Sequence, residues 1–72
     1  MANKTEIMLK QVRSFYKRFY RFPDYIYVGK KEVKRDTIVE VVEGLIGRPY
    51  QWYKRRKVIA QLDDALLMLQ QA

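Results

Sequence analysis

The stretch over residues 4–23, KTEIMLKQVRSFYKRFYRFP, decides how the chain begins to fold. Its apolar residues recur at alternating spacings of four and three, a pattern typical of one face of an amphipathic helix. Pro23 cannot continue a helix and disfavours the helical conformation in the residue before it. We therefore predict a helix over about residues 4–21, capped by Asn3 or Thr5. Its apolar face carries Met8, Val12, Phe15, Phe19 and Phe22.

The opposite face of this predicted helix is cationic. A rotation of about 100° per residue gathers basic side chains there, with two tyrosines on the flank. Long cations are also the ordinary choice for exposed helical positions, so this helix alone fits both a phosphate-binding ridge and a solvated surface. The basic residues are Lys10, Arg13, Lys17 and Arg21, and the tyrosines are Tyr16 and Tyr20.

Residues 24–35 combine β-favouring side chains with a central glycine. Tyr25–Val28 can form a short strand, and Gly29 with Lys30 can turn the chain into a second one over 31–35. We predict a short β-ribbon or an extended loop here. Its tip either touches a phosphate backbone, as a wing does, or is a solvated basic loop. The basic residues assigned to this tip are Lys30, Lys31, Lys34 and Arg35.

A second helix is predicted over residues 36–46, capped by Asp36 or Thr37 and stopped by a glycine. Its β-branched residues make a strand the alternative, but the spacing of the apolar residues favours a helix. Glu40 and Glu43 lie on the outer face and would repel DNA, so we assign this helix to support. The apolar face consists of Ile38, Val41, Val42, Leu45 and Ile46.

Residues 48–57, RPYQWYKRRK, place three large rings before four consecutive cations. Cations attract phosphates, and rings stack on bases. Pro49 has the φ angle of a first helical residue, so we predict a third helix over about residues 49–70. Trp52 is either a partly buried anchor or a stacking ring. The apolar stripe of this helix is Val58, Ile59, Leu62, Ala65, Leu66 and Leu69.

Two roles can be assigned to the candidate binding residues. Cations that neutralise phosphates set affinity without reading sequence. Polar and aromatic residues at the start of the third helix can contact base edges or stack, if that helix enters a groove. The phosphate-binding candidates are Arg13, Lys17, Arg21, Lys30, Lys31, Lys34, Arg35, Lys54, Arg56 and Lys57. The base-contacting candidates are Arg48, Tyr50, Gln51 and Tyr53.

The outer side of the third helix is not wholly polar. Ala60 and Leu67 lie opposite the apolar stripe, and Met68 lies between the two sides. A terminal helix with apolar residues on both sides has a second packing surface. We predict a homodimer through this helix.

The composition limits the classes of protein that the chain can belong to. Its 72 residues make a single small domain, residues 1–72, without cysteine or histidine. This absence removes disulfides, ordinary zinc sites and thiol or imidazole catalysis, and Ser14 has no base beside it. We expect neither enzymatic activity nor a metal or cofactor. No apolar run has membrane-spanning length and no secretory signal precedes the domain, so we expect a cytoplasmic protein.

The charge is high and unevenly distributed. The formal net charge is +7 and the pI is near 9.9. Residues 48–57 carry five cations and no acid, whereas residues 36–47 carry three acids and no cation. Such segregation favours a polyanionic partner that meets one side of the molecule.

Two stretches resemble known families. Residues 27–36, YVGKKEVKRD, resemble the wing and following helix of excisionase-type winged-helix proteins, although the family's helix-turn-helix would precede that wing. Residues 45–57, LIGRPYQWYKRRK, with their leucine-rich continuation look like the closing helix-turn-helix of small phage transcription regulators of the sigma-region-4 type. This second resemblance implies that residues 50–57 enter the major groove.

Taken together, the sequence predicts a mainly α fold with three helices and a short β-ribbon or extended loop. The expected function is non-enzymatic nucleic-acid binding, with duplex DNA favoured, as a small regulator or accessory factor of phage or mobile-element type. The alternative is a protein-binding module or inhibitor that docks its basic, aromatic surface on an acidic protein.

Overall fold

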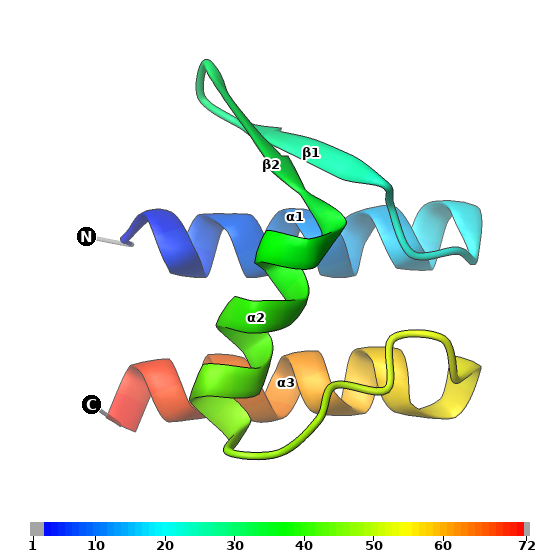
Figure 1. Cartoon of the computed structure of the whole chain (residues 1–72), viewed down its shortest axis with the longest axis vertical. Coiled ribbons are helices and arrows are strands. Elements are labelled where there is room, and N and C mark those ends of the chain that lie inside the picture. The colour runs from blue at the N-terminus through cyan, green and yellow to red at the C-terminus, as the bar shows by residue number, and fades with distance from the viewer. Residues whose placement is uncertain (1–2, 72) are drawn as a thin grey trace.

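The computed structural model describes residues 3–71 and confirms a mainly α fold with a short β-hairpin. Figure 1 shows helices α1 and α3 running in opposite directions, with α2 crossing in front of both. The end of α1 and the start of α3 therefore lie at the same end of the molecule. The elements are α1 (Lys4–Phe19), β1 (Tyr25–Val28), β2 (Lys31–Lys34), α2 (Arg35–Ile46) and α3 (Arg55–Gln71).

Helix α1 is capped as predicted but ends two residues early. The Asn3 side chain accepts a hydrogen bond from the Glu6 N–H at 2.7 Å, which satisfies one of the free amides of the first turn. The helix stops because Tyr20 adopts a left-handed conformation, with φ at 57°. The Tyr20 N–H still bonds to the Tyr16 carbonyl at 2.7 Å.

The buried face of α1 differs from the predicted one. Tyr16, predicted on the flank, is buried, whereas Phe19 is 51% exposed and Phe15 is half-buried. The two phenylalanines pack on each other at 4.7 Å between ring centroids. Two overlapping helical stripes are apolar, and tertiary packing selects the one that meets α3 and the hairpin. That face consists of Met8, Leu9, Val12 and Tyr16.

The β-ribbon is present, with its turn at Gly29 and Lys30. The two strands are antiparallel, and Ile26 pairs with Val33 on the face that is buried against α1. Gly29 has φ at 65°, a conformation that favours glycine and reverses the chain tightly.

The membership of the predicted basic tip needs correction. Lys34 pairs with Tyr25 at the open end of the hairpin, and Arg35 is the first residue of α2. The turn itself carries Lys30, and Lys31 pairs with Val28 directly after it. Strand pairing explains the difference, because each residue of β2 beyond Lys31 lies farther from the turn.

Helix α2 has its predicted extent but not its predicted cap. Lys34 occupies the cap position, and no side chain bonds to the free amides of the first turn. The Arg35 N–H donates instead to the Asp24 carbonyl at 2.8 Å, so the loop before the hairpin satisfies it. A cap by Asp36 or Thr37 is therefore wrong.

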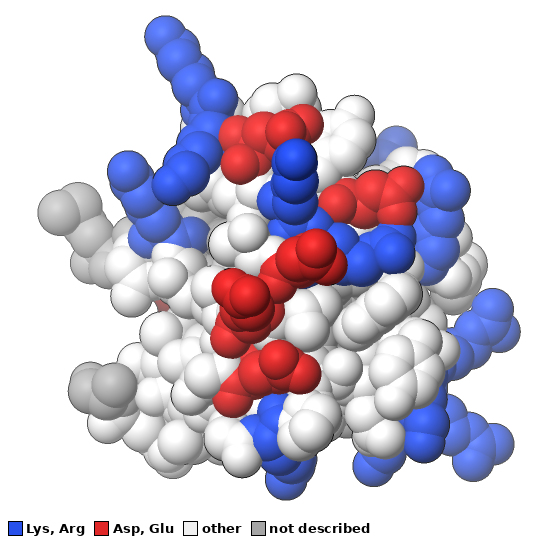
Figure 2. All heavy atoms as spheres, viewed as in Figure 1, with Lys and Arg blue, Asp and Glu red and all other residues white. Residues whose placement is uncertain are grey.

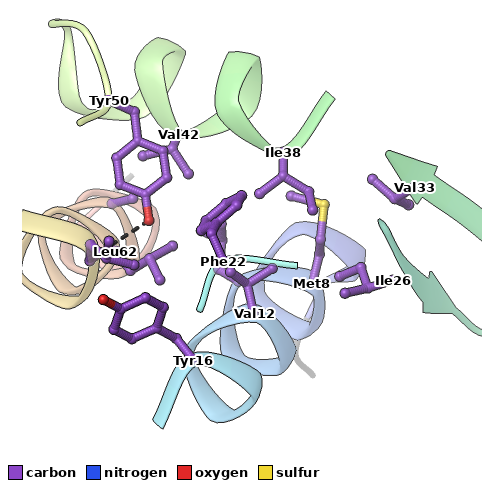
Figure 3. Packing of buried hydrophobic residues seen from close by; sticks show 13 residues of the cluster. Met8, Val12, Tyr16, Phe22, Ile26, Val33, Ile38, Val42, Tyr50 and Leu62 are labelled. Atoms are coloured by element: carbon purple, nitrogen blue, oxygen red, sulfur yellow. Dashed lines mark hydrogen bonds between the residues drawn. The ribbon is translucent and has the colours of Figure 1, made fainter. Parts of the chain in front are cut away.

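A single core joins all five elements. Figure 3 shows side chains from the helices, the hairpin and the two connecting loops converging between α1, α2 and α3. Phe22, which follows α1, fills the space at the end of that helix and is buried. Side chains that are almost wholly buried are Leu9, Val12, Ile38, Val42, Val58 and Leu62. Among residues 3–71, no helix combines the length and the apolar character needed to cross a bilayer.

Candidate functional site

Residues 47–54 connect α2 to α3 as an ordered loop, so the predicted helix start at Pro49 is wrong. Gly47 ends α2 with φ at 72°, and its N–H donates to the Glu43 carbonyl at 2.9 Å. This left-handed position suits glycine and redirects the chain. The helical signal of Pro49 is local, and contacts to α2 and α3 override it.

Tyr50 is the anchor of this loop. Its side chain is 2% exposed, and its ring packs edge-on against Phe22 with the centroids 5.6 Å apart. The Tyr50 hydroxyl donates to the Val58 carbonyl at 3.0 Å, as the dashed line in Figure 3 shows. The Tyr50 N–H donates to the Glu43 carboxylate at 2.9 Å. Tyr50 is thus a core residue, and its predicted contact with bases is wrong.

The environment of Tyr50 keeps its hydroxyl neutral. Burial raises the pKa of the Tyr50 hydroxyl above its ordinary value, and the neighbouring Tyr16 hydroxyl raises it further. A neutral hydroxyl retains the proton that it donates to α3.

Gln61 fixes the two residues around Tyr50. It is 4% exposed, and its carbonyl oxygen accepts from the Gln51 N–H at 2.7 Å. Its amide nitrogen donates to the Pro49 carbonyl at 3.3 Å. One buried side chain therefore satisfies two polar groups of the loop backbone, the Gln51 N–H and the Pro49 carbonyl. The backbone of Gln51 is held by this bond, and the residue is half-buried. Gln51 therefore lies in a fixed loop and not at the start of a helix, where its contact with bases was predicted.

The first turn of α3 concentrates positive charge. The Lys54 carbonyl accepts from the Lys57 and Val58 N–H groups, so Lys54 starts the helix. Residues 54–57 are all exposed cations, and the first turn contains no acid. Within residues 3–71, none of these four side chains forms an ion pair. They lie at the positive pole of the helix dipole, which disfavours cations.

The end of α1 adds further cations at the same end of the molecule (Figure 1). Figure 2 shows acidic side chains along α2 in the middle of one face, and basic side chains at the rim, including the corner where the loop joins α3. We call this cationic region the basic end. It consists of Lys17, Arg18, Arg21, Lys54, Arg55, Arg56 and Lys57, which are all exposed.

An open hollow of about 490 Å³ lies within the basic end. It forms where the end of α1, the link to β1, the first residue of α2 and the loop before α3 meet. Tyr20, Arg21, Trp52, Tyr53 and Arg55 are among its lining residues. We call it the Tyr20–Tyr53 hollow.

Trp52 forms a fixed wall of this hollow. The guanidinium carbon of Arg35 lies 4.5 Å from the centre of the Trp52 ring, and Phe22 packs against the ring at 5.8 Å. Arg35 is itself held by an ion pair with Asp24 and by the Pro23 carbonyl at 3.4 Å. Trp52 is half-buried and packs against the core, as the anchor interpretation predicts.

Three of the predicted phosphate- or base-binding arginines are paired with acids of the chain itself. Arg13 donates to Asp63 at 2.8 Å and Arg48 to Asp64 at 3.1 Å, and Arg35 pairs with Asp24. These pairs join α1 to α3, the loop to α3 and the hairpin's approach to α2. Each aspartate lies at least 11 residues from its arginine in the sequence, so no local helical spacing indicates the pairs. The charge of each arginine is therefore partly balanced within the chain, although the Arg48–Asp64 pair is exposed on both sides.

The remaining predicted residues fall into two groups. One group is exposed at the end of the molecule where α1 ends and α3 starts: Lys17, Arg21, Tyr53, Lys54, Arg56 and Lys57. Lys30, Lys31 and Lys34 are exposed on the hairpin. The hairpin turn lies away from the start of α3 (Figure 1), so Lys30 and Lys31 are separate from the basic end, whereas Lys34 lies at the open end of the hairpin, next to Arg35.

Arg18, Tyr20 and Arg55 were not predicted as binding residues, stacking was one of two interpretations of Trp52, and no role was predicted for Gln61. A signal for Gln61 was present, because a glutamine between Val58 and Leu62 interrupts an otherwise apolar stripe. A polar residue in a buried stripe requires a hydrogen-bonding partner. The hollow residues had no comparable signal, since they come from four separate segments.

The outer side of α3 is exposed where the homodimer is predicted. Leu67 is 52% exposed and Met68 is 47% exposed. The homodimer stays a prediction, which light scattering at increasing protein concentration tests.

No family model, curated protein or solved structure matches this chain.

Proposed function

We propose that this chain is a non-enzymatic nucleic-acid-binding protein whose basic end binds the phosphate backbone. The observation that carries the proposal is the set of four consecutive cations at the positive pole of α3, Lys54–Lys57, which form no ion pair within residues 3–71. Lys17, Arg18 and Arg21 extend this charge across the end of α1. The net charge of +7 adds long-range attraction for a polyanion.

The energetics of the α3 start support an anionic partner. Like charges at neighbouring positions repel one another, and each cation near a helix start costs about 0.3–1 kcal/mol at low ionic strength. Phosphates placed among these side chains would remove that cost and release condensed counterions from the nucleic acid. Among residues 3–71 no acid pairs with these four side chains, and the acids of α3, Asp63 and Asp64, pair with Arg13 and Arg48.

The details predicted for duplex reading do not follow from this geometry. A helix-turn-helix joins its helices by a turn of about three to four residues, whereas residues 47–54 separate α2 from α3. A single helix precedes the hairpin, in place of the helix-turn-helix that the winged-helix resemblance requires. Phosphate binding at the basic end does not depend on either motif.

Charge reversal at the start of α3 tests the proposal. In the double variant Arg56→Glu, Lys57→Glu, affinity for unrelated duplexes and single strands should fall together, because phosphate contacts carry no sequence information. The slope of log affinity against log salt should also become shallower, by roughly 0.7–0.9 for each lost phosphate contact. Fluorescence anisotropy over a salt series measures both, and the circular dichroism should stay unchanged.

The matched control reverses the same charge elsewhere. Lys30→Glu, Lys31→Glu changes two exposed cations at the hairpin turn, away from the basic end. This variant should retain most of the affinity. Equal weakening by both double variants would show that net charge, and not the basic end, governs binding.

The alternative function is docking on an acidic protein. The exposed arginines and tyrosines of the basic end are also residue types that dominate protein interfaces. Polyglutamate of matched charge separates the two functions as a competitor. Failure of every nucleic acid to bind at low salt, together with binding of polyglutamate, would favour the protein partner.

A further inference from the structure

The Tyr20–Tyr53 hollow collects the most exposed rings of the described chain. Tyr20 is 69% exposed and Tyr53 is 66% exposed, and among residues 3–71 these are the largest values for a large hydrophobic side chain. Both line the same hollow although they lie on different segments. Two large rings facing water at one place expose apolar area that a ligand could cover.

The wall behind these rings is fixed. Arg35 lies over Trp52 at 4.5 Å, and its charge is balanced by Asp24, the acid among the lining residues of the hollow. Tyr53 meets the Trp52 ring edge-on at 5.8 Å. The Tyr53 ring is therefore positioned by Trp52 while remaining mostly exposed.

The backbone at Tyr20 is strained. Its φ of 57° makes it the non-glycine residue of the described chain with positive φ. For a residue with a Cβ this conformation costs roughly 1–2 kcal/mol. Tyr20 is the C-cap of α1, and a left-handed residue is a common way for a helix to end. Here the left-handed turn places the Tyr20 ring at the hollow.

The rim of the hollow is cationic. Arg21 and Arg55 are exposed lining residues, and within residues 3–71 neither forms an ion pair. The Lys54–Lys57 run continues from the rim along the start of α3. An occupant should therefore combine a flat ring with negative charges on either side, which is the repeating unit of a nucleic acid strand.

Resting on the proposed function, we propose that this hollow takes an unpaired base of single-stranded nucleic acid, which stacks on Tyr53 and Tyr20. Arg21 and Arg55 bind the phosphates that flank it. A base within a duplex is stacked between its neighbours and cannot enter a side-chain hollow without being extruded. Single strands offer their bases freely, so they bind more tightly than duplexes of equal length.

Trp52 reports on the hollow, because it is the one tryptophan of the chain. The probes are a 12-nucleotide oligothymidylate, the same strand with abasic sugars at every position, and a 12-base-pair duplex. Oligothymidylate should quench Trp52 fluorescence and bind more tightly than the other two. The corresponding oligouridylate should quench it as well, since stacking does not require deoxyribose.

Variants at Tyr53 separate stacking from charge. Tyr53→Ala should weaken oligothymidylate binding roughly 5- to 100-fold, as expected for loss of one aromatic stack. Its affinity for the abasic strand should not change, and Tyr53→Phe should restore tight binding. Tyr27→Ala is the matched control, because Tyr27 is 56% exposed on the hairpin and does not line the hollow.

The outcomes distinguish this inference from the proposed function. The base-stacking hollow is refuted, while phosphate binding stands, if the abasic strand binds as tightly as oligothymidylate. The same holds if Tyr53→Ala leaves the affinity for oligothymidylate unchanged. Tighter binding of the duplex also refutes the hollow. If no strand of any kind binds, both proposals fail together.

Discussion

Tyr50 and Tyr53 lie in the same loop, yet the structure uses them in opposite ways. Tyr50 is 2% exposed, with its hydroxyl bonded to Val58 and its N–H bonded to Glu43. Tyr53 is 66% exposed and contacts Trp52 edge-on. The first tyrosine holds the loop on the core, and the second projects from the surface that the first one fixes.

The contrast shows how a small domain can present rings to a ligand. Exposed aromatic residues need a rigid base, because ordering a mobile loop on binding costs conformational entropy. Tyr50 and Gln61 provide that base through four hydrogen bonds from α2 and α3. The buried Tyr50 therefore fixes the loop from which the exposed Tyr53 projects.

The largest expected effect separates the two tyrosines by stability. Tyr50→Ala removes a buried ring and should destabilise the fold by about 3–5 kcal/mol. A domain of this size has a total stability of only about 3–5 kcal/mol, so the variant should be largely unfolded. Tyr53→Ala should change the free energy of unfolding by less than about 0.5 kcal/mol. Urea titration followed by circular dichroism measures both.

A Tyr50→Ala variant that remains folded would contradict the role of Tyr50 as the anchor of the loop. Tyr50→Phe is the conservative partner, since it keeps the ring against Phe22 and loses the hydroxyl. It should remain folded. Equal destabilisation by Tyr50→Ala and Tyr53→Ala would remove the distinction between the two tyrosines.

The next effect concerns the Gln61 contacts on either side of Tyr50. Gln61→Ala leaves the Gln51 N–H and the Pro49 carbonyl without their partner and should cost about 1–3 kcal/mol. Gln61→Glu keeps the acceptor for Gln51 but puts a buried carboxylate beside the Pro49 carbonyl, so at neutral pH it should cost at least as much. Hydrogen exchange at the Gln51 amide should become faster in the alanine variant. Unchanged exchange in a folded Gln61→Ala protein would show that the loop is held without Gln61.

Sequence reasoning succeeded where the determinants are local. The turn at Gly29–Lys30, the stop at Gly47 and the existence of all three helices follow from neighbouring residues. It misplaced the start of α3, because Pro49 is typical of a first helical residue but lies in a loop. It also could not tell the three rings of RPYQWYKRRK apart, because their local signals are similar. Which ring is buried depends on the space that Phe22 and Val58 leave, and only the tertiary structure contains that information.

The candidate site shows the same division. The cations of residues 54–57 could be predicted as exposed, since long charged side chains rarely lie inside. The sequence could not predict that Arg13 and Arg48, unlike these cations, form ion pairs. Those pairs depend on two aspartates of α3 that the fold brings close to α1 and to the loop. The hollow was not predictable either, since Tyr20 and Tyr53 are brought together by packing.

An alkaline titration sharpens the contrast at the level of one hydroxyl. Because burial raises the pKa of Tyr50, its stabilising contribution is fully present below the unfolded-state pKa of about 10. Above that pH the unfolded chain loses this proton more readily than the folded chain does, so stability falls as pH rises.

The Tyr50→Phe variant isolates this effect. At neutral pH it should be less stable than the wild type by about 1 kcal/mol, because the hydrogen bond to Val58 is lost. As pH rises through about 10, the difference should shrink by up to about 1.4 kcal/mol per pH unit. Urea titrations between about pH 8 and 11 measure it. A difference that is constant over this range would show that Tyr50 does not titrate differently in the folded state.

The smallest expected effect concerns Tyr20, which is exposed like Tyr53 but held in a strained backbone. Tyr20→Gly relieves the left-handed strain, although glycine gains freedom in the unfolded chain, so a net stabilisation of about 0.5–1 kcal/mol is expected. Tyr20→Ala removes the same ring but keeps the strain, and its stability should match that of the wild type. Both variants should bind oligothymidylate equally weakly if the ring is needed only for stacking. A loss of stability in Tyr20→Gly would instead mean that the Tyr20 ring stabilises the fold by packing, as the Tyr50 ring does. Tyr20 would then belong with the anchoring tyrosines and not with the exposed ones.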